Sequence, residues 1–539
     1  SIQIGRTGRT AAAAAVMALI TAACSSGTTS TTTNTSAPSA PAPTTAAPAS
    51  DSISSTSPTA TAKATTTTST EAPTGPAGTT RLHFEYGPIT IHPGQNNIQF
   101  SKGAVPKPTE DGWILRMAPN LRYADGAVPP VDVLHLHHGV WLNASRTDST
   151  VPQYPERFMA AGEEKTITQF PDGFGYPYKA SDQWIINYML HDLTPNGGQV
   201  WITYDLDFLP ASAPAAAAVR PVRPIWMDVQ NGSGYPVFDA IKGTGTDGTF
   251  TYPDQATDPY QGKSAPPNVW TVDRDGVLIT TGGHLHPGGL HDDLYLDRNG
   301  ASAHLFKAEA HYFEPAGAVS WDVATTVTNP DWRVAVQAGD QLRVTTTYDT
   351  SRASWYESMG IMVAWMADPI AGESATDPFT TSVDRPGVLT HGHLPENDNH
   401  GGTGTELADP TKRAVATSPE DGDITIAGFA YGAGDMSAVD PIPTVKAGET
   451  LTFRNDDAPL GPGIWHSITA CAAPCNQSTG IAYPLADGGV AFDSGQLGNA
   501  GPPTAGRVDW QTPADFKPGL YTYFCRIHPF MRGAFDVTS

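Results

Sequence analysis

The sequence predicts an all-β protein, with two tandem β-sandwich domains of the jelly-roll type followed by a third, Greek-key sandwich. From residue 81 onward, apolar residues occur in short runs that alternate with polar ones or are rich in β-branched residues, such as QVWITYDLDF and QLRVTTTYDT. Clusters of Gly, Pro, Asn and Asp separate these runs, as expected for turns between strands. No long segment has the periodicity of an amphipathic helix. Many short strands with frequent turns favour sandwiches.

The length and the shifts in composition divide the chain into several parts. A chain of 539 residues has room for about three domains. The predicted parts are an export signal at 1–24, a disordered linker at 25–80, the two sandwiches at 81–212 and 213–370, a histidine-containing connector at 371–421, and the third sandwich at 422–539.

The first residues predict export. Arg6 and Arg9 precede the apolar run 11–20, and small residues then lead to Cys24. This order is typical of a secretory signal, and it resembles a bacterial lipobox, in which Cys24 would carry the lipid. The run is too short to span a membrane, which takes about 20 apolar residues. We therefore expect a lipoprotein on the outer face of the cytoplasmic membrane, held by its lipid anchor only, or a secreted protein.

The linker at 25–80 consists almost only of Ser, Thr, Ala, Pro and Gly. Such a composition cannot bury enough apolar surface to fold, so it predicts a disordered tether. The formal net charge of -23 excludes nucleic acid as a partner, since that binding depends on Lys and Arg. Cys471 and Cys475 lie close together in CAAPC, which predicts a local disulfide in an exported domain. A second metal site is the alternative.

The C-terminal segment predicts a metal site. In GLYTYFCRIHPFMRGAFDV, Cys525, His528 and Met531 follow one another at intervals of three residues, and His466 lies upstream in GIWHSITA. Two imidazoles, one thiolate and a weak axial thioether form the donor set of blue (type 1) copper. Residues 422–539 resemble the plastocyanin-like cupredoxins in these motifs. A sandwich without metal is the alternative, but all four ligands are present.

Histidines also cluster upstream, and all 16 histidines of the chain follow residue 80. The main groups are HLHHGVW at 135–141, NYMLHDL with His191, and GGHLHPGG at 283–289. Residues two apart on a strand share a face, so His284 can chelate an ion together with His286. His135 and His137 can do the same. His137 and His138 face opposite sides unless the strand bulges or ends there.

Residues 81 to about 368 resemble the copper type II, ascorbate-dependent monooxygenases, the family of the peptidylglycine α-hydroxylating and dopamine β-monooxygenases. The likeness lies in the histidine motifs, in GEEKTITQFPDGFGYPYKASDQWIINYMLHDL and in ESMGIMVAW. It implies two β-sandwich domains with one copper each. The chain departs from the family in having no cysteine between Cys24 and Cys471, in His-His-Gly where the family has His-His-Met, and in the extra His135.

The resemblance also implies ligand sets and a reaction. His137, His138 and His191 would bind a copper that supplies an electron. His284, His286 and Met359 would bind the catalytic copper, at which O2 hydroxylates an aliphatic C–H bond; Met362 and Met366 lie close to Met359. The expected cofactors are thus one type 1 copper and two type 2 coppers. The expected partners are O2, a small organic or peptide-like substrate and an electron donor, with the blue-copper domain passing electrons on.

Two other functions compete with an oxygenase. The same ligands would suit a copper carrier or store at the cell surface, or a protein that only transfers electrons. The linker has no Met-rich or His-rich tract, which favours the enzyme. A further group in HGHLPENDNHGG predicts either an additional metal site or solvated histidines: His391, His393 and His400. For the histidines without motif context we expect surface or structural roles: His83, His92, His291, His304 and His311.

Overall fold

The computed structural model of the chain describes residues 63–65, 72–194, 196–233, 236–257, 266–313, 321–369, 374–397, 407–416, 422–438, 440–458, 464–476, 491–498 and 507–539. Within these ranges the chain is all-β, which confirms the predicted fold class. The helical elements described are three short 3₁₀ turns: η1 (Pro214–Ala218), η2 (Pro395–Asn397) and η3 (Pro410–Lys412). None of the described helices is long and apolar enough to cross a membrane.

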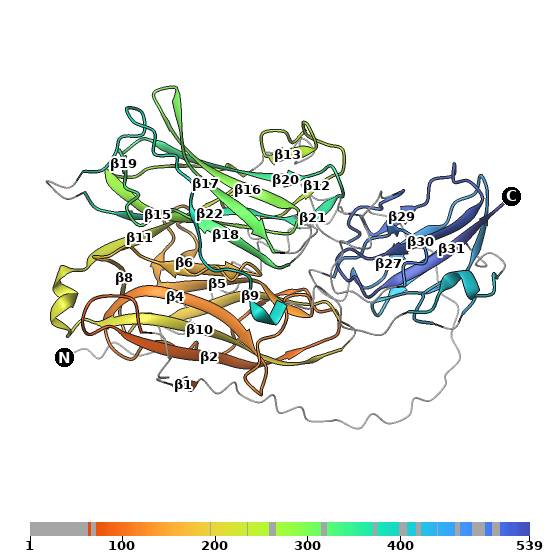
Figure 1. Cartoon of the computed structure of the whole chain (residues 1–539), viewed down its shortest axis with the longest axis horizontal. Coiled ribbons are helices and arrows are strands. Elements are labelled where there is room, and N and C mark those ends of the chain that lie inside the picture. The colour runs from red at the N-terminus through yellow and green to blue at the C-terminus, as the bar shows by residue number, and fades with distance from the viewer. Residues whose placement is uncertain are drawn as a thin grey trace, which may run out of the picture.

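The first sandwich is formed by two sheets that face each other (Figure 1). Side chains along β4 alternate between more and less buried positions, as expected for a strand with one face in a core. One sheet contains β1 (Lys63–Thr65), β2 (Thr80–Ile91), β10 (Gly198–Pro210), β4 (Gly112–Arg122), β7 (Thr168–Gln169) and β8 (Phe174–Tyr178). The other has the order β3 (Ile98–Phe100), β9 (Trp184–Asp192), β5 (Leu134–Thr147) and β6 (Pro155–Gly162).

The second sandwich follows the same plan and lies against the first (Figure 1). One sheet is built from β11 (Arg220–Asp228), β22 (Gly360–Ala367), β15 (Gly276–Leu285), β18 (Val323–Val327), β19 (Val334–Val336) and β23 (Val388–Leu389). The other holds β17 (Ala301–Tyr312), β16 (Gly289–Arg298), β20 (Gln341–Asp349), β13 (Thr249–Tyr252) and β14 (Val269–Thr271). A small separate sheet pairs β12 (Phe238–Ala240) with β21 (Trp355–Ser358).

The third sandwich lies beside the other two, at the right of Figure 1. Its first sheet has the order β25 (Ala430–Tyr431), β24 (Asp423–Ala427), β27 (Thr452–Asn455) and β29 (Asp509–Gln511). Its second has the order β26 (Thr444–Lys446), β31 (Arg532–Thr538), β30 (Gly519–Phe524) and β28 (Thr469–Cys471). Parallel pairs β24–β27 and β26–β31 join strands that are distant along the chain.

Each sandwich has its own apolar core, but the first two cores are not independent. The core of the first sandwich also contains Ile279, Trp365 and Ala367 from β15 and β22 of the second. Trp365 is 3% exposed, and its ring lies edge-on to Phe170 at a centroid distance of 4.6 Å. In addition, the start of β11 pairs in parallel with β8. The two sandwiches are therefore joined through packed aromatic side chains as well as through backbone hydrogen bonds.

Parts of the range 25–80, for which the composition predicts disorder, are structured. β1 pairs antiparallel with β2, and the backbone N–H of Thr74 donates to the Asp207 carboxylate at 2.8 Å. These segments have few apolar residues to bury, and strand pairing and this hydrogen bond attach them to the first sandwich. The predicted lipidation site Cys24 lies outside the described residues.

Candidate metal centres

The C-terminal sandwich brings a thiolate and two imidazoles together in its interior. Cys525 directly follows β30, and the loop after it carries His528 and Met531 back into β31. The Nδ1 atoms of His466 and His528 are 3.2 Å apart, and they lie 3.8 Å and 3.7 Å from the Cys525 Sγ atom. All three side chains are buried. Met531 is buried in the same core, and its backbone N–H donates to the His528 carbonyl.

Surrounding groups hold this donor set in place. The Nε2 atom of His466 lies 2.8 Å from the Asp457 carboxylate, which leaves Nδ1 to face the sulfur. The backbone N–H groups of Ser467 and His528 both point to the Cys525 Sγ atom at 3.4 Å. Donors aimed at the sulfur stabilise a thiolate, and the carboxylate orients the imidazole. These residues fit a blue-copper ion. The nearby Cys471 and Cys475 form a disulfide, with their Cα atoms 5.9 Å apart.

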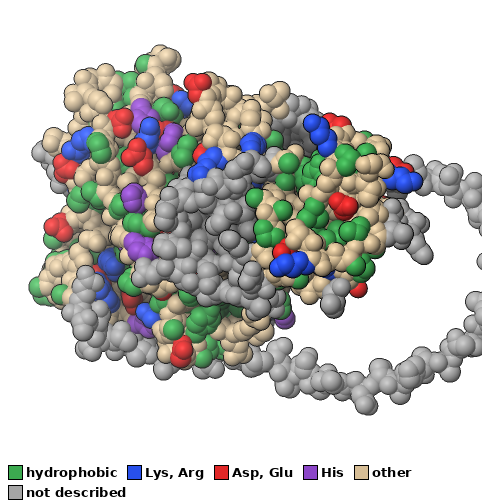
Figure 2. All heavy atoms as spheres, turned by 45° about the vertical axis from the view of Figure 1, so that its right-hand side comes forward, with side chains coloured by type: hydrophobic (Ala, Val, Ile, Leu, Met, Phe, Trp, Pro, Cys, Tyr) green, Lys and Arg blue, Asp and Glu red, His purple; other side chains and the backbone are tan. Residues whose placement is uncertain are grey.

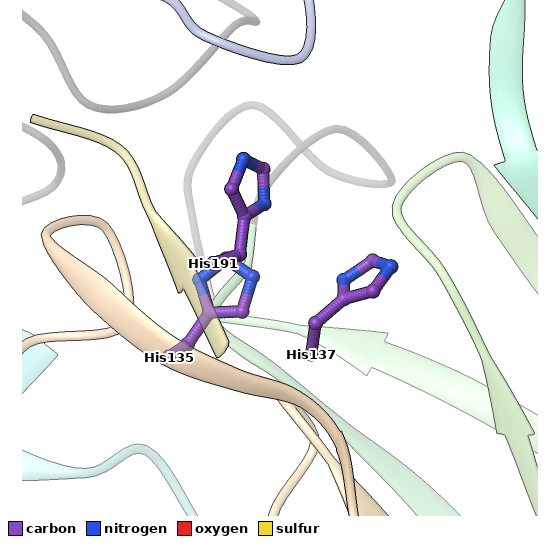
Figure 3. Close-up of side chains that lie close together, drawn as sticks. All are labelled: His135, His137 and His191. Carbon is purple, nitrogen blue, oxygen red and sulfur yellow. The ribbon is translucent and has the colours of Figure 1, made fainter. Parts of the chain in front are cut away.

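A second cluster lies in the first sandwich. His135 and His137 extend from β5 to the same side, where His191 of β9 meets them (Figure 3). His135 and His191 are direct partners in the β5–β9 register, and one nitrogen of each of the three rings lies within 4.8 Å of the others. The indole of Trp321 covers this group, with its centroid 4.2 Å from the His135 ring. The three histidines are buried and converge as ligands of one ion would.

His138 does not join this group. The β5–β9 register shifts between Leu136 and His138, but the bulge leaves His138 on the opposite side from its neighbour. There it lines a cavity together with His284. The resemblance assigned His138 to the ion of His137 and His191, whereas the structure places His135 in that position. Successive side chains of a strand point to opposite faces, and the bulge does not bring His138 to the face of His137.

His284, His286 and Met359 come together where β15 ends and β22 begins. The register pairs His284 with Ile361 and Leu285 with Gly360, and His286 and Met359 are the residues that directly adjoin this last pair. The Tyr348 hydroxyl connects the two segments, because it accepts from the His286 N–H at 3.0 Å and donates to the Met359 carbonyl at 2.6 Å. The rings of His284 and His286 are 5.1 Å apart, and all three predicted ligands are buried.

The histidine cluster of the first sandwich lies in contact with the His284, His286 and Met359 group. The rings of His137 and His286 have centroids only 4.0 Å apart. Glu163, just after β6, joins them, and His137, Glu163 and His286 form a second group with potential ligand atoms within 4.8 Å of one another. Glu163 was not among the ligands predicted from the sequence. Its one signal was a pair of acidic residues, Glu163 and Glu164, after the apolar end of β6.

The histidines of both clusters carry lone pairs that are available to a cation. Burial lowers the pKa of His191 to about 4 and that of His138 to about 3, so both rings are neutral at pH 7. In most rings one nitrogen is already bonded to the protein: His135 Nδ1 to the Val131 carbonyl, His284 Nδ1 to Glu164, and His286 Nδ1 to the Glu357 carbonyl. Their Nε2 atoms are buried without a hydrogen-bond partner among the described residues. Metal-binding histidines have this arrangement.

A cavity of about 870 Å³ opens beside these clusters and is lined by both sandwiches. His138, His284, Glu164 and Met359 contribute to its wall. The wall also has apolar residues, which include Met159, Phe170, Trp226, Ile361 and Trp365, and polar or charged ones, which include Arg157, Asp228, Thr281, Asp331 and Arg333. A cavity of this size with apolar walls and polar groups suits a small organic molecule.

The C-terminal sandwich contacts the first cluster directly. The Nε2–H of His191 donates to the Ile527 carbonyl at 2.7 Å, and the rings of His191 and His528 have centroids 5.8 Å apart. Further contacts hold the domains together. The Tyr356 hydroxyl bonds the Asp493 carboxylate, and the Arg526 guanidinium lies 4.7 Å from the centre of the Trp355 ring.

The other predicted histidines lie apart from these groups. His391 Nε2 contacts the Glu164 carbonyl, and His393 Nδ1 lies 2.7 Å from Asp322. Neither joins a metal-binding group among the described residues, and His400 lies outside them. The five remaining histidines are half-buried or exposed: His83, His92, His291, His304 and His311. On the face shown in Figure 2, several histidines reach the surface among interspersed acidic and basic side chains.

Comparisons with solved structures find similarity to small cupredoxins. No family model matches the chain, and neither does any curated protein. Among solved structures, a purple cupredoxin from Nitrosopumilus maritimus is 19% identical, with 22% of this chain and 98% of that chain covered and a TM-score of 0.14. The Cu(I) form of an amicyanin variant is also 19% identical, with 24% and 91% covered and a TM-score of 0.14. At these values the matches carry no functional inference, and the metal sites rest on donor geometry.

Proposed function

We propose that the chain is a copper-dependent monooxygenase in which a blue-copper domain passes electrons to copper ions held between two β-sandwiches. The observation that supports this best is the hydrogen bond from His191 to the Ile527 carbonyl, because it joins the two donor sets without intervening solvent. A protein that only stored copper would not need a blue site packed against a second ligand cluster. A protein that only carried electrons would not need the large cavity beside it.

The proposed reaction inserts one oxygen atom of O2 into an aliphatic C–H bond and releases the other as water. It consumes two electrons and two protons, and the electrons arrive through the C-terminal domain from an external donor. Copper bound by two imidazoles and a thioether supplies O2 chemistry, because this donor set favours Cu(I). The chain's own residues provide the rest. Glu164 orients His284, Tyr348 holds His286 beside Met359, and the apolar wall of the cavity binds the substrate.

The lining of the cavity indicates the kind of substrate. Aromatic and aliphatic side chains from both sandwiches line it, and polar or charged residues that can orient a ligand lie among them, including Arg157, Asn187, Asp228 and Arg333. Apolar lining contributes about 25 cal/mol per Å² of apolar surface removed from water. We therefore propose a small, largely apolar molecule or a short peptide with an aromatic side chain as the substrate.

The test uses the full chain loaded with copper and supplied with ascorbate and ¹⁸O2. A panel of alkylbenzenes and short aromatic peptides is screened for hydroxylated product that contains ¹⁸O. We expect labelled product from the wild type and at least about 100-fold less from Met359→Ala. The control is Met436→Ala, because Met436 is a buried methionine of the C-terminal sandwich and does not line the cavity. One copper per chain, all of it blue, would leave an electron-transfer protein and overturn the proposal.

A further inference from the structure

His137 differs from the other histidines around it. It is the one described histidine whose two ring nitrogens are both buried without a hydrogen-bond partner among the described residues. In His135, His191, His284 and His286, one nitrogen is bonded to the protein and the other is left for a ligand. Burying an unpaired polar atom is costly. Two such atoms on one ring indicate that both nitrogens have partners when the protein is in its working state.

His137 is also the residue that the two groups share. On one side it converges with His135 and His191 of the first sandwich, and on the other with Glu163 and His286. Its Nδ1 atom lies 3.8 Å from the Glu163 carboxylate, and its ring centroid lies 4.0 Å from that of His286. One imidazole has a nitrogen on each of two sides, so His137 can serve both groups at once.

Glu163 provides an independent indication of a cation at this place. Its side chain is fully buried, and neither carboxylate oxygen has a hydrogen-bond partner among the described residues. A buried carboxylate without a partner is strongly unfavourable unless it binds a cation. Histidine and carboxylate together are donors that divalent metal ions accept.

We propose that His137 bridges two metal ions as an imidazolate. Nδ1 binds the ion that Glu163 and His286 also hold, and Nε2 binds the ion of His135 and His191. When the second ion binds, the ring releases its N–H proton to solvent, and no electron is transferred. The imidazolate and the Glu163 carboxylate together offset part of the charge of two divalent ions in a buried site. The two upstream sites are then one dinuclear centre whose ligands come from both sandwiches.

This proposal rests on the copper-binding part of the proposed function and does not depend on the oxygenase reaction. A bridging imidazolate couples the spins of two Cu(II) ions, so that the pair loses most of its EPR signal at low temperature. The test therefore compares total copper with integrated EPR spins in the full chain loaded with Cu(II). For the wild type we expect about three coppers per chain and about one spin, that of the blue copper.

Variants of His137 separate the bridge from simple binding. In His137→Asn and His137→Gln, a side-chain amide replaces the imidazole ring. The amide can bind one ion but cannot bridge two, so the number of EPR spins should rise until it equals the number of copper ions. His304→Gln is the control, because His304 lies in a separate cluster with Asp293 and Asp384 and should behave as the wild type. Equal copper and spin counts in the wild type would overturn the bridge even if the variants do not fold. Fewer than about three coppers would overturn the dinuclear site itself.

Discussion

The Nε2 atom of His191 lies 2.7 Å from the carbonyl oxygen of Ile527, the residue that immediately precedes His528. A ring of the first sandwich is thus hydrogen-bonded to the backbone of the loop that carries Cys525 and His528. The contact also uses the nitrogen of His191 that faces away from its own cluster, so Nδ1 is left for an ion. On the proposed function, this hydrogen bond places the two metal sites at short range, and it requires that the domains stay docked.

The docking contact around Arg526 should contribute strongly to stability. Arg526 is buried and lies over the Trp355 ring, while burial raises the pKa of the Asp493 carboxyl and the charge of Arg526 opposes this rise. We expect Arg526→Met to cost about 3 kcal/mol, since the packing on Trp355 and the charge that favours the Asp493 carboxylate are both lost. Denaturation followed by the blue absorption band measures this loss. The exposed pair Arg454–Asp456 gives the control, because Arg454→Met should cost less than about 1 kcal/mol. Equal effects would show that Asp493 is not paired with Arg526.

Asp457 should determine how tightly the blue site holds copper. Its carboxylate orients His466 from outside the donor set, at 2.8 Å from Nε2. Loss of such a contact typically lowers metal affinity by about 10–100-fold, and we expect this for Asp457→Asn. Competition with a copper chelator gives the affinity. The adjacent Asp456 pairs with Arg454 at the surface, so Asp456→Asn should leave the affinity unchanged. If both variants bind alike, Asp457 does not orient the ligand.

Tyr348 should affect the His284, His286 and Met359 site without touching the blue one. Its hydroxyl connects the backbones of His286 and Met359. We expect Tyr348→Phe to weaken copper binding at that site by about 10–100-fold, because the two segments lose the contact that aligns them. Copper titration followed by EPR measures the effect, with the blue band as internal reference. Tyr523→Phe is a matched control, since the Tyr523 hydroxyl is buried without a partner among the described residues.

Trp365 should stabilise both sandwiches at once. It extends from β22 of the second sandwich into the core of the first. Trp365→Ala should cost about 3–5 kcal/mol, the usual range for deleting a large buried side chain. We expect both sandwiches to unfold at a lower denaturant concentration, as measured by tryptophan fluorescence and circular dichroism. Val415 is 54% exposed, and Val415→Ala should change stability by less than about 0.5 kcal/mol. Destabilisation confined to one sandwich would contradict a shared core.

His304 should give the second sandwich a pH-dependent increment of stability. Its hydrogen bonds to Asp293 and Asp384 raise its pKa above 6.5. A raised pKa means that the protonated ring favours the folded state, so the increment is fully present below pH 6.5 and is lost as the pH rises through the folded pKa. Because the side chain is only half-buried, the increment is less than about 1 kcal/mol. Melting curves of wild type and His304→Gln should differ most in acid and converge in base. A constant difference would contradict this assignment.

The local parts of these sites were predictable from the sequence. The spacing of Cys525, His528 and Met531 defines one loop, so the blue-copper donors could be named once His466 was seen upstream. Strand alternation likewise indicated that His135 and His137 share a face, and the structure brings both to His191. The resemblance instead favoured His138. Its side chain lies on the other face of the strand and lines the cavity.

The contacts between domains were not predictable in the same way. Glu163 meets His286 across about 120 residues of sequence, and Ile527 meets His191 across more than 300, which no local spacing encodes. These contacts depend on how whole sandwiches pack, and that is decided by residues such as Trp365 and Arg526. Such residues resemble ordinary core or surface positions when the sequence is read alone.

The shared core of the two sandwiches also bears on how a substrate reaches the cavity. If the sandwiches swung apart to admit it, Trp365 and Phe170 would be exposed to water, and the aromatic contact between them would be lost. That cost makes wide separation of the sandwiches unfavourable. On the proposed function, a substrate then reaches the cavity while the two sandwiches stay packed together, so the fixed dimensions of the cavity set an upper limit on the molecules that the protein can process.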